Sequence, residues 1–181
     1  MKYFKKMKGF DMSPPRKPLS KIAWSWVGSF LGIYLIGLMS YVSCNDPTNL
    51  FFLIGSFGAS AVLVFGAPQL DFSQPRNLLG GQLLSALTGI TLYKYLDVDL
   101  ITLAALSVSL SVVIMHLTRT LHPPGGATAL IAIIGSSEVH ELGYWFALSP
   151  VLLGSFIMLI VALLVNNLSA NEKRHYPRYW L

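Results

Sequence analysis

Charged residues and cysteine are scarce in this chain of 181 residues. Only 12% of the residues are charged, against roughly 25% in an average soluble domain. Cys44 is the one cysteine, which excludes an intrachain disulfide and a metal site built from several cysteines. By contrast, 54% of the residues are hydrophobic, more than a soluble core of this size can absorb. The composition therefore predicts an integral membrane protein.

The apolar residues form separate segments, which cover 22–42, 50–67, 78–93, 100–117, 127–134 and 145–165. A helix needs about 20 apolar residues to cross a bilayer. The first, fourth and last segments meet this length, the third nearly does, and 50–67 is marginal. The segment 127–134 is too short, and together with 122–126 it predicts an extended stretch followed by half a helix. We therefore expect an all-α, polytopic membrane protein with about six hydrophobic segments: four long helices and two short, broken or re-entrant ones.

The placement of charge predicts the orientation in the membrane. Seven Lys and Arg residues precede the first segment and three follow the last, so the positive-inside rule places both termini in the cytoplasm. Six crossings would put Arg76 and Arg119 on the cytoplasmic side, whereas four would put them outside. The six-crossing topology fits the arginines better. Residues 1–21 and 169–181 are then cytoplasmic tails around one transmembrane domain, 22–168. The basic first tail either contacts anionic lipid headgroups or serves only as a topology signal.

An internal repeat runs through the domain. The motif Gly58-Ala59-Ser60-Ala61 is matched by Gly126-Ala127-Thr128-Ala129, and the run from Pro75 to Gly80 has a shorter counterpart from Pro150 to Gly154. The repeats would cover about 22–95 and 100–168, with the second inverted relative to the first. Transporters built from inverted repeats form their sites at the midplane, where broken helices of the two halves meet.

The residues His122 to Gly126 interrupt this apolar sequence. Pro123 and Pro124 suit the first turn of a helix, where a missing donor is harmless. Gly125 and Gly126 then offer backbone N–H groups at a helix N-terminus, which binds anions without a buried lysine. The alternative is that both glycines only allow close helix packing, although such an interface has no use for the prolines.

The first half of the chain carries a matching set. Ser56, Phe57 and Gly58 begin its short helix, and the hydroxyls of Ser60 and Thr128 are placed to complete an anion cage of low net charge. Such a cage releases its ligand more readily than an arginine clamp, as conduction requires.

Other polar residues have two interpretations each. His122 either couples protons or is a neutral histidine bonded to a carbonyl. Arg76, beside Gln74 and Asn77, either attracts anions or organises a polar network in the linker, and Arg119 is interpreted as an interfacial arginine. Glycine faces at Gly28, Gly32 and 80–89 serve either oligomerisation or packing within the subunit.

Three blocks of the sequence resemble the signature of the HPP family, which is named for its His-Pro-Pro motif. These blocks are His122 to Ala129, Gly55 to Ser60 and Gln74 to Gly81, and the resemblance extends from about Trp24 to Trp180. The family consists of small integral membrane proteins, and its members in cyanobacteria and chloroplasts are associated with nitrite transport. The resemblance implies that this chain moves nitrite or a similar small anion.

We therefore expect a transporter or channel for a small monovalent anion, with nitrite as the leading candidate, in a bacterial inner membrane. The alternative is a membrane scaffold without transport activity. We expect no enzymatic activity, cofactor, metal site or nucleic-acid partner, and we expect a homo-oligomer in contact with lipid. The expected substrate-binding residues are His122, Pro123, Pro124, Gly125, Gly126, Thr128, Ser56, Gly58, Ser60, Arg76 and Asn77.

Overall fold

The computed structural model describes residues 2–9, 11–44, 53–169 and 174–181, and within these ranges it contains helices and no strand. The helices are α1 (Lys2–Lys5), α2 (Leu19–Cys44), α3 (Gly55–Ala61), η1 (Val62–Gly66), η2 (Asp71–Ser73), α4 (Pro75–Tyr95), α5 (Leu100–Leu117), α6 (Pro123–Ile134), α7 (Ser137–Leu142), η3 (Ala147–Leu152) and α8 (Leu153–Leu168). The segments η1 and η3 are π-helical and η2 is a 3₁₀ turn. The all-α prediction is confirmed for the described residues.

Three helical stretches are long and apolar enough to cross a membrane: Leu19–Val42, Leu100–Leu117 and Ala147–Leu168. Two shorter apolar helices, Gly55–Gly66 and Pro123–Ile134, lie between them. The chain is thus a membrane protein with helical spans. The start of the segment 50–67, before residue 53, lies outside the described residues.

The second short helix begins earlier than the sequence predicts. We expected an extended stretch over 122–126, but only His122 is extended, and α6 starts at Pro123. Prolines at the first two helical positions have φ already near the helical value and lose no needed hydrogen bond, so Gly125 and Gly126 continue the first turn. The last apolar segment is also less regular than predicted, since Ser149 has non-helical φ and ψ just before α8.

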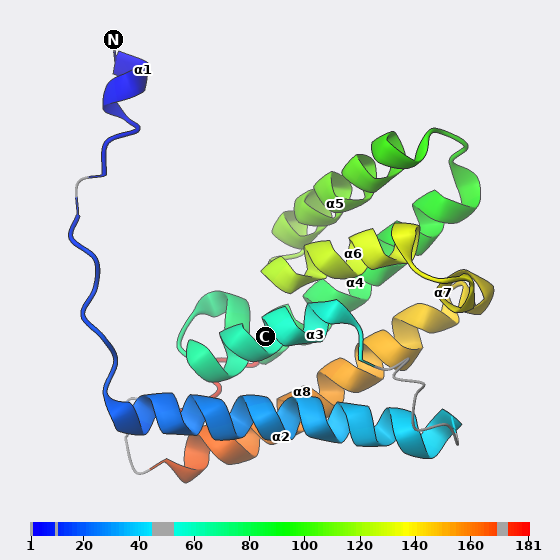
Figure 1. Ribbon diagram of the computed structural model, residues 1–181. Coiled ribbons are helices and arrows are strands. Elements are labelled where there is room, and N and C mark those ends of the chain that lie inside the picture. The colour runs from blue at the N-terminus through cyan, green and yellow to red at the C-terminus, as the bar shows by residue number, and fades with distance from the viewer. Residues whose placement is uncertain (1, 10, 45–52, 170–173) are drawn as a thin grey trace.

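The helices alternate in direction, and α3 lies between two groups (Figure 1). Helices α2 and α8 pack against each other, and α4, α5 and α6 form the second group. In Figure 1, α2, α4 and α6 run from left to right, whereas α3, α5 and α8 run from right to left. Consequently, the start of α2, the end of α8, the start of α4 with Arg76 and the linker after α5 with Arg119 lie at one end of the molecule.

Contacts at this end confirm the grouping. The Arg174 guanidinium donates to the carbonyl of Lys21, at 3.1 Å. Arg178 pairs with Asp71 at 3.4 Å, just before α4. We call this the basic end, because it gathers Arg76 of α4, Arg119 of the linker after α5 and the arginines of the C-terminal segment.

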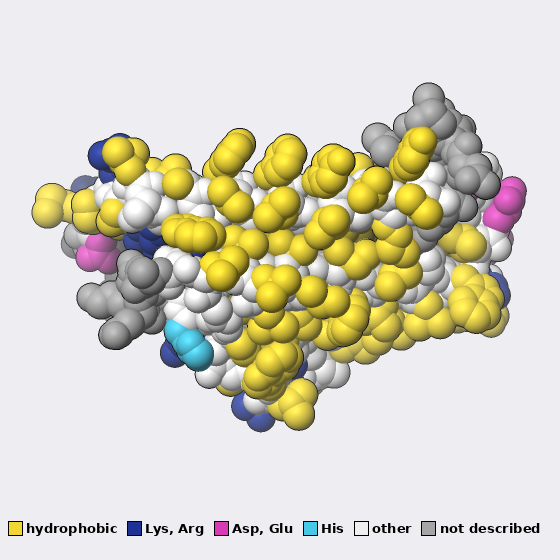
Figure 2. Space-filling view, turned by 90° about the horizontal axis from the view of Figure 1, so that it is seen from below, with side chains coloured by type: hydrophobic (Ala, Val, Ile, Leu, Met, Phe, Trp, Pro, Cys, Tyr) yellow, Lys and Arg dark blue, Asp and Glu magenta, His cyan; other side chains and the backbone are white. Residues whose placement is uncertain are grey.

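The flanks of the molecule are apolar. Large hydrophobic side chains of α2, α5 and α8 are exposed, including Phe30, Ile101 and Leu164. Figure 2 shows one such flank, where hydrophobic side chains cover the middle and charged ones gather at the margins. An exposed apolar surface of this extent is what a lipid-facing protein presents.

Both halves follow the order long helix, short helix, linker, long helix, but they pack differently. In the second half, α6 lies so close to α4 that a Cβ on Gly89 would lie 2.5 Å from the Cβ of Ala132. In the first half, η1 instead packs the ring of Phe65 against Gly28 and Gly32 of α2. The inverted repeat therefore stays a prediction. The glycine faces that we considered for oligomerisation are used within the subunit.

Candidate functional site

The His122 side chain is fully buried where α3, α4 and α6 meet. Its Nδ1 lies 2.7 Å from the carbonyl oxygen of Phe72, and its Nε2 lies 2.8 Å from Oγ of Ser60. Because a carbonyl only accepts, Nδ1 carries the hydrogen, and in a neutral ring Nε2 then accepts from the Ser60 hydroxyl. The carbonyl contact agrees with one of the two interpretations of the sequence, a neutral histidine bonded to a carbonyl.

The amide of Gln82, from α4, extends this contact into a network. Its Nε2 donates to Oγ of Ser60 at 2.9 Å, and its Oε1 accepts from the hydroxyl of Thr128. All four side chains, Ser60, Gln82, His122 and Thr128, are fully buried. We call them the polar core network, which joins both short helices to α4 inside an apolar bundle.

Gln82 is a residue that sequence reasoning missed. The available signal was an amide within the otherwise apolar run 78–93, since a polar side chain inside a membrane segment is costly and usually has a partner. The predicted residues Ser60, His122 and Thr128 do meet, and Gln82 is the link between them.

The paired glycines of α6 differ in their surroundings. A Cβ on Gly125 would lie 2.6 Å from Oγ of Ser85 and 2.9 Å from the carbonyl of Gly81. The N–H of Gly125 donates to the carbonyl of His122 at 2.8 Å. Gly125 therefore allows close packing of α6 on α4. The prediction of a free N–H at Gly125 is wrong, because this N–H donates to the carbonyl of His122.

Gly126 and Gly58 have space beside them. The nearest atom to a Cβ on Gly126 would be Cγ1 of Val108, at 3.6 Å, and nothing lies within 4 Å of one on Gly58. The neighbouring Ser56 is fully buried, and its hydroxyl has no hydrogen-bond partner among the described residues. In the first turn of α6, Pro124 is buried and Pro123 is exposed.

Arg76 and Asn77 stand apart from the polar core network and hold the linker between α5 and α6. Nη2 of Arg76 donates to the carbonyl of Thr118 at 2.7 Å, and Nδ2 of Asn77 donates to that of Leu121 at 2.8 Å. These contacts support the interpretation of Arg76 as an organiser of the linker. The predicted site residues thus fall into two groups, one inside the bundle and one at the basic end.

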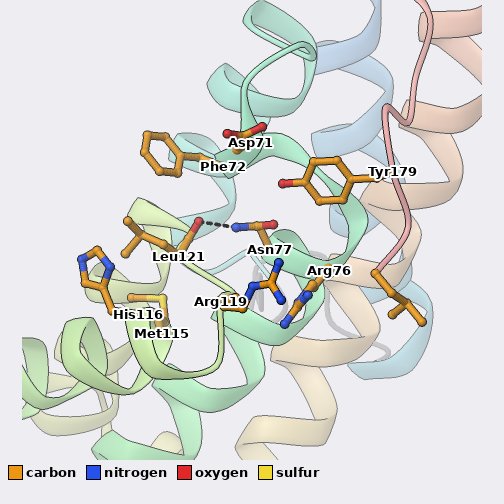
Figure 3. Close-up of a pocket in the computed structure, with 10 residues that line it drawn as sticks. Asp71, Phe72, Arg76, Asn77, Met115, His116, Arg119, Leu121 and Tyr179 are labelled. Atoms are coloured by element: carbon orange, nitrogen blue, oxygen red, sulfur yellow. Dashed lines mark hydrogen bonds between the residues drawn. The ribbon is translucent and has the colours of Figure 1, made fainter.

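A cavity of about 490 Å³ opens beside the second group. Figure 3 shows its lining, which includes Asp71, Arg76, Asn77, His116, Arg119 and Tyr179. Oδ1 of Asn77 is buried and has no hydrogen-bond partner among the described residues. Burial raises the pKa of the Tyr179 hydroxyl, and the charge of Asp71 adds to this rise.

The C-terminal segment closes the basic end. Arg174 is buried, and it donates to the carbonyl of Phe65 and to Oδ1 of Asn166, each at 3.0 Å. Burial lowers the pKa of Arg174. The hydroxyl of Tyr176 donates to the carbonyl of Ser73 at 2.9 Å. Sequence reasoning interpreted Arg174 only as a topology signal, because nothing local indicates these partners.

Comparison with known proteins identifies two relatives that are also membrane proteins. The chain is 46% identical over 183 residues to one transmembrane protein of Dictyostelium discoideum and 44% identical over 185 residues to another. Each alignment covers 99% of this chain, but the chain spans only 58% and 64% of these curated relatives. No solved structure matches the chain. These relatives are eukaryotic and do not support the expectation of a bacterial inner membrane.

The chain also matches the model of a protein family. The model of the HPP transmembrane region matches residues 14–177, which include the His-Pro-Pro motif and every helix from α2 to α8. The resemblance inferred from the sequence is thereby confirmed. The chain belongs to the HPP family of membrane proteins.

Proposed function

We propose that this protein conducts a small monovalent anion across a membrane, with nitrite as the leading candidate. The observation that carries the proposal is the polar core network, which lies fully buried where the short helices α3 and α6 meet. Polar groups inside a membrane domain are costly and usually mark a pathway for substrate or ions. The HPP family resemblance supplies nitrite as the candidate.

Space beside two glycines supports a binding role for the short helices. Gly58, which is exposed, and Gly126, which is half-buried, each lie in the first turns of a short helix, and a Cβ at either position meets no close neighbour. A site made of backbone N–H groups and the hydroxyls of Ser60 and Thr128 would carry low net charge. Weak binding of this kind allows an anion to enter and leave.

The membrane potential sets a requirement for uptake. An inside-negative membrane opposes the uptake of an anion by about 2.3 kcal/mol per 100 mV. Uptake of nitrite therefore needs a proton partner, a concentration gradient or consumption inside. A second proton on His122 would occupy Nε2 and displace the hydroxyl hydrogen of Ser60, so the polar core network would rearrange on protonation.

We also propose that both termini are cytoplasmic. The basic end carries Arg76, Arg119 and the described C-terminal arginines, and the positive-inside rule places such a cluster in the cytoplasm.

Nitrite flux into liposomes that contain the purified full chain tests the proposal. Wild-type protein should admit nitrite, and Gly58→Val and Gly126→Val should each slow the flux while the protein stays folded, because a Cβ at either position meets no atom closer than 3.6 Å. Gly9→Val is the matched control, since this glycine of the N-terminal arm also has nothing within 4 Å. Liposomes that stay closed to nitrite, nitrate, formate and chloride would refute transport.

A scaffold role is the second candidate, and the close packing of Gly81, Gly89 and Gly125 favours it. Small residues that bring helices together are sufficient to explain these positions. A folded protein without flux in the liposome experiment would favour this alternative.

A further inference from the structure

Two adjoining hollows lie at the basic end. The first is the polar cavity of about 490 Å³ described above, which we call the arginine recess after its lining residues Arg76 and Arg119. The second is an apolar groove of about 530 Å³, lined by Pro75, Leu79, Gly80, Thr120 and Trp180. Arg76 and Leu181 line both hollows, so the groove continues directly from the recess.

The two arginines that line the recess, Arg76 and Arg119, lie outside the one ion pair found at this end among the described residues. Asp71 lies on its rim, but this carboxylate pairs with Arg178 at 3.4 Å. Among the described residues, neither Arg76 nor Arg119 makes an ion pair. Arg76 uses one N–H on the carbonyl of Thr118, which leaves most of the five donors of its guanidinium available to a ligand.

The backbone at Arg119 is left-handed, which is uncommon for a residue other than glycine and indicates that the arginine side chain has a function. Helix α5 ends in a Schellman motif, in which the N–H of Thr120 donates to the carbonyl of Met115 at 2.8 Å and that of Arg119 to His116 at 3.1 Å. Arg119 occupies the left-handed position of this motif, with φ of 59°. Glycine usually takes this position because it has no Cβ to strain the backbone.

Both hollows lie at the boundary of a membrane span. The span Leu100–Leu117 ends two residues before Arg119, and Leu117 is 78% exposed on its flank. Trp180, which lines the groove, is 56% exposed. Arginine and tryptophan at the end of a span occupy the level of the lipid headgroups.

We propose that the recess and the groove together bind one anionic phospholipid. The phosphate would lie between Arg76 and Arg119, and an acyl chain would follow the groove along Leu79 and Trp180. A recess of unpaired arginines recognises the negative headgroup, and the apolar lining that continues from it accommodates a hydrocarbon chain but not a soluble anion. No side chain of the polar core network lines either hollow, and the proposal does not depend on anion transport.

Native mass spectrometry of the full chain in detergent tests the site, with phosphatidylglycerol and phosphatidylcholine as probes. We expect the anionic lipid to bind about tenfold more tightly than phosphatidylcholine, given the contribution of two arginines near a headgroup. The pair Arg76→Gln with Arg119→Gln should remove this preference. The matched control is Arg16→Gln with Lys17→Gln, which removes the same charge from the exposed N-terminal arm and should leave the preference unchanged.

Further variants separate lipid binding from folding and from binding of a free anion. Arg119→Gly relieves the left-handed backbone, so it should keep or raise the melting temperature and still weaken the preference. Trp180→Ala should weaken binding of both lipids. Soluble glycerol phosphate should fail to displace phosphatidylglycerol. Equal binding of the two lipids, a preference that survives the double arginine variant, or displacement by glycerol phosphate at matched concentration would each overturn the proposal.

Discussion

The short helices α3 and α6 correspond in the sequence repeat, yet the structure anchors them at opposite ends. Helix α6 is held at its start, where His122 bonds to Ser60 and Gly125 packs on α4. The segment formed by α3 and η1 is held at its end, where the carbonyl of Phe65 accepts from Ser25 and Arg174. Neither helix has a side-chain cap at its start.

This difference follows from the opposite directions of the two helices. Both anchors lie on the side of the basic end, because α6 begins on that side of the bundle and η1 ends there. The basic end is thus a common platform from which both short helices extend into the bundle. We expect changes to the platform to cost more stability than changes to the open glycines.

Arg174→Ala should have the largest effect on stability. The variant removes a buried guanidinium that bonds to Lys21, Phe65 and Asn166. Since hydrogen bonds to charged groups each contribute about 1.5–3 kcal/mol, we expect a loss of about 3 kcal/mol or more in the free energy of unfolding in detergent. Arg178→Ala is the control and should cost less than about 1 kcal/mol, because its ion pair is exposed. An equal loss of unfolding free energy in both variants would contradict the claim that the basic end anchors the short helices.

Gly125→Ala and Gly126→Ala should change the stability in opposite directions. The methyl group on Gly125 would collide with Ser85 and with the backbone of Gly81, so we expect a loss of about 1–3 kcal/mol. The methyl group on Gly126 has room, so the better helix propensity of alanine should add about 0.5–1 kcal/mol. Thermal unfolding of both variants measures the difference. A stable Gly125→Ala protein would show that α6 does not lie closely against α4.

Gln82→Leu should destabilise the junction of the short helices. The change removes the donor to Ser60 and the acceptor of Thr128, and both hydroxyls stay buried. We expect a loss of about 1–3 kcal/mol, measured by chemical unfolding in detergent. Ser85→Ala is the control on the same helix, since its hydroxyl makes only a weak contact with the sulfur of Met115 at 3.6 Å. A similar loss of stability in both variants would contradict the claim that Gln82 links the two short helices.

Asp99→Asn should have the smallest effect, and only at low pH. Hydrogen bonds from Thr102 hold the pKa of Asp99 below its usual value, so the cap stabilises α5 above about pH 4. As the pH falls through the lowered pKa of the folded state, the carboxylate gains a proton and this contribution is lost. Asparagine also caps helices but does not titrate. The variant should therefore lose less stability than the wild type between pH 5 and pH 3; a parallel loss would refute the role of this carboxylate.

The helices could be predicted from the sequence, because long apolar runs and prolines act locally. The run 100–117 matches the bounds of α5, and the prolines at 123 and 124 lie in the first turn of α6, although we expected an extended stretch over 122–126. The error at Gly125 arose because glycine suits both a binding loop and a tight helix contact, and only the position of Gly81 distinguishes them.

The partners of the buried polar groups could not be predicted. Gln82 lies 22 residues from Ser60 and 46 from Thr128, and Arg174 lies 109 residues from Phe65. No local pattern determines which distant carbonyl or hydroxyl a buried side chain meets, since tertiary packing brings them together. The sequence motifs indicated which segments carry the candidate site, but only the fold shows which residues of these segments form hydrogen bonds with each other.

Nitrite flux in liposomes, compared between wild type, Gly126→Val and Gly9→Val, tests the central claim most directly. The account predicts rapid flux for wild type and Gly9→Val and slow flux for a folded Gly126→Val protein. Closed wild-type liposomes, or equal flux through all three proteins, would contradict the claim that the junction of α3 and α6 conducts an anion.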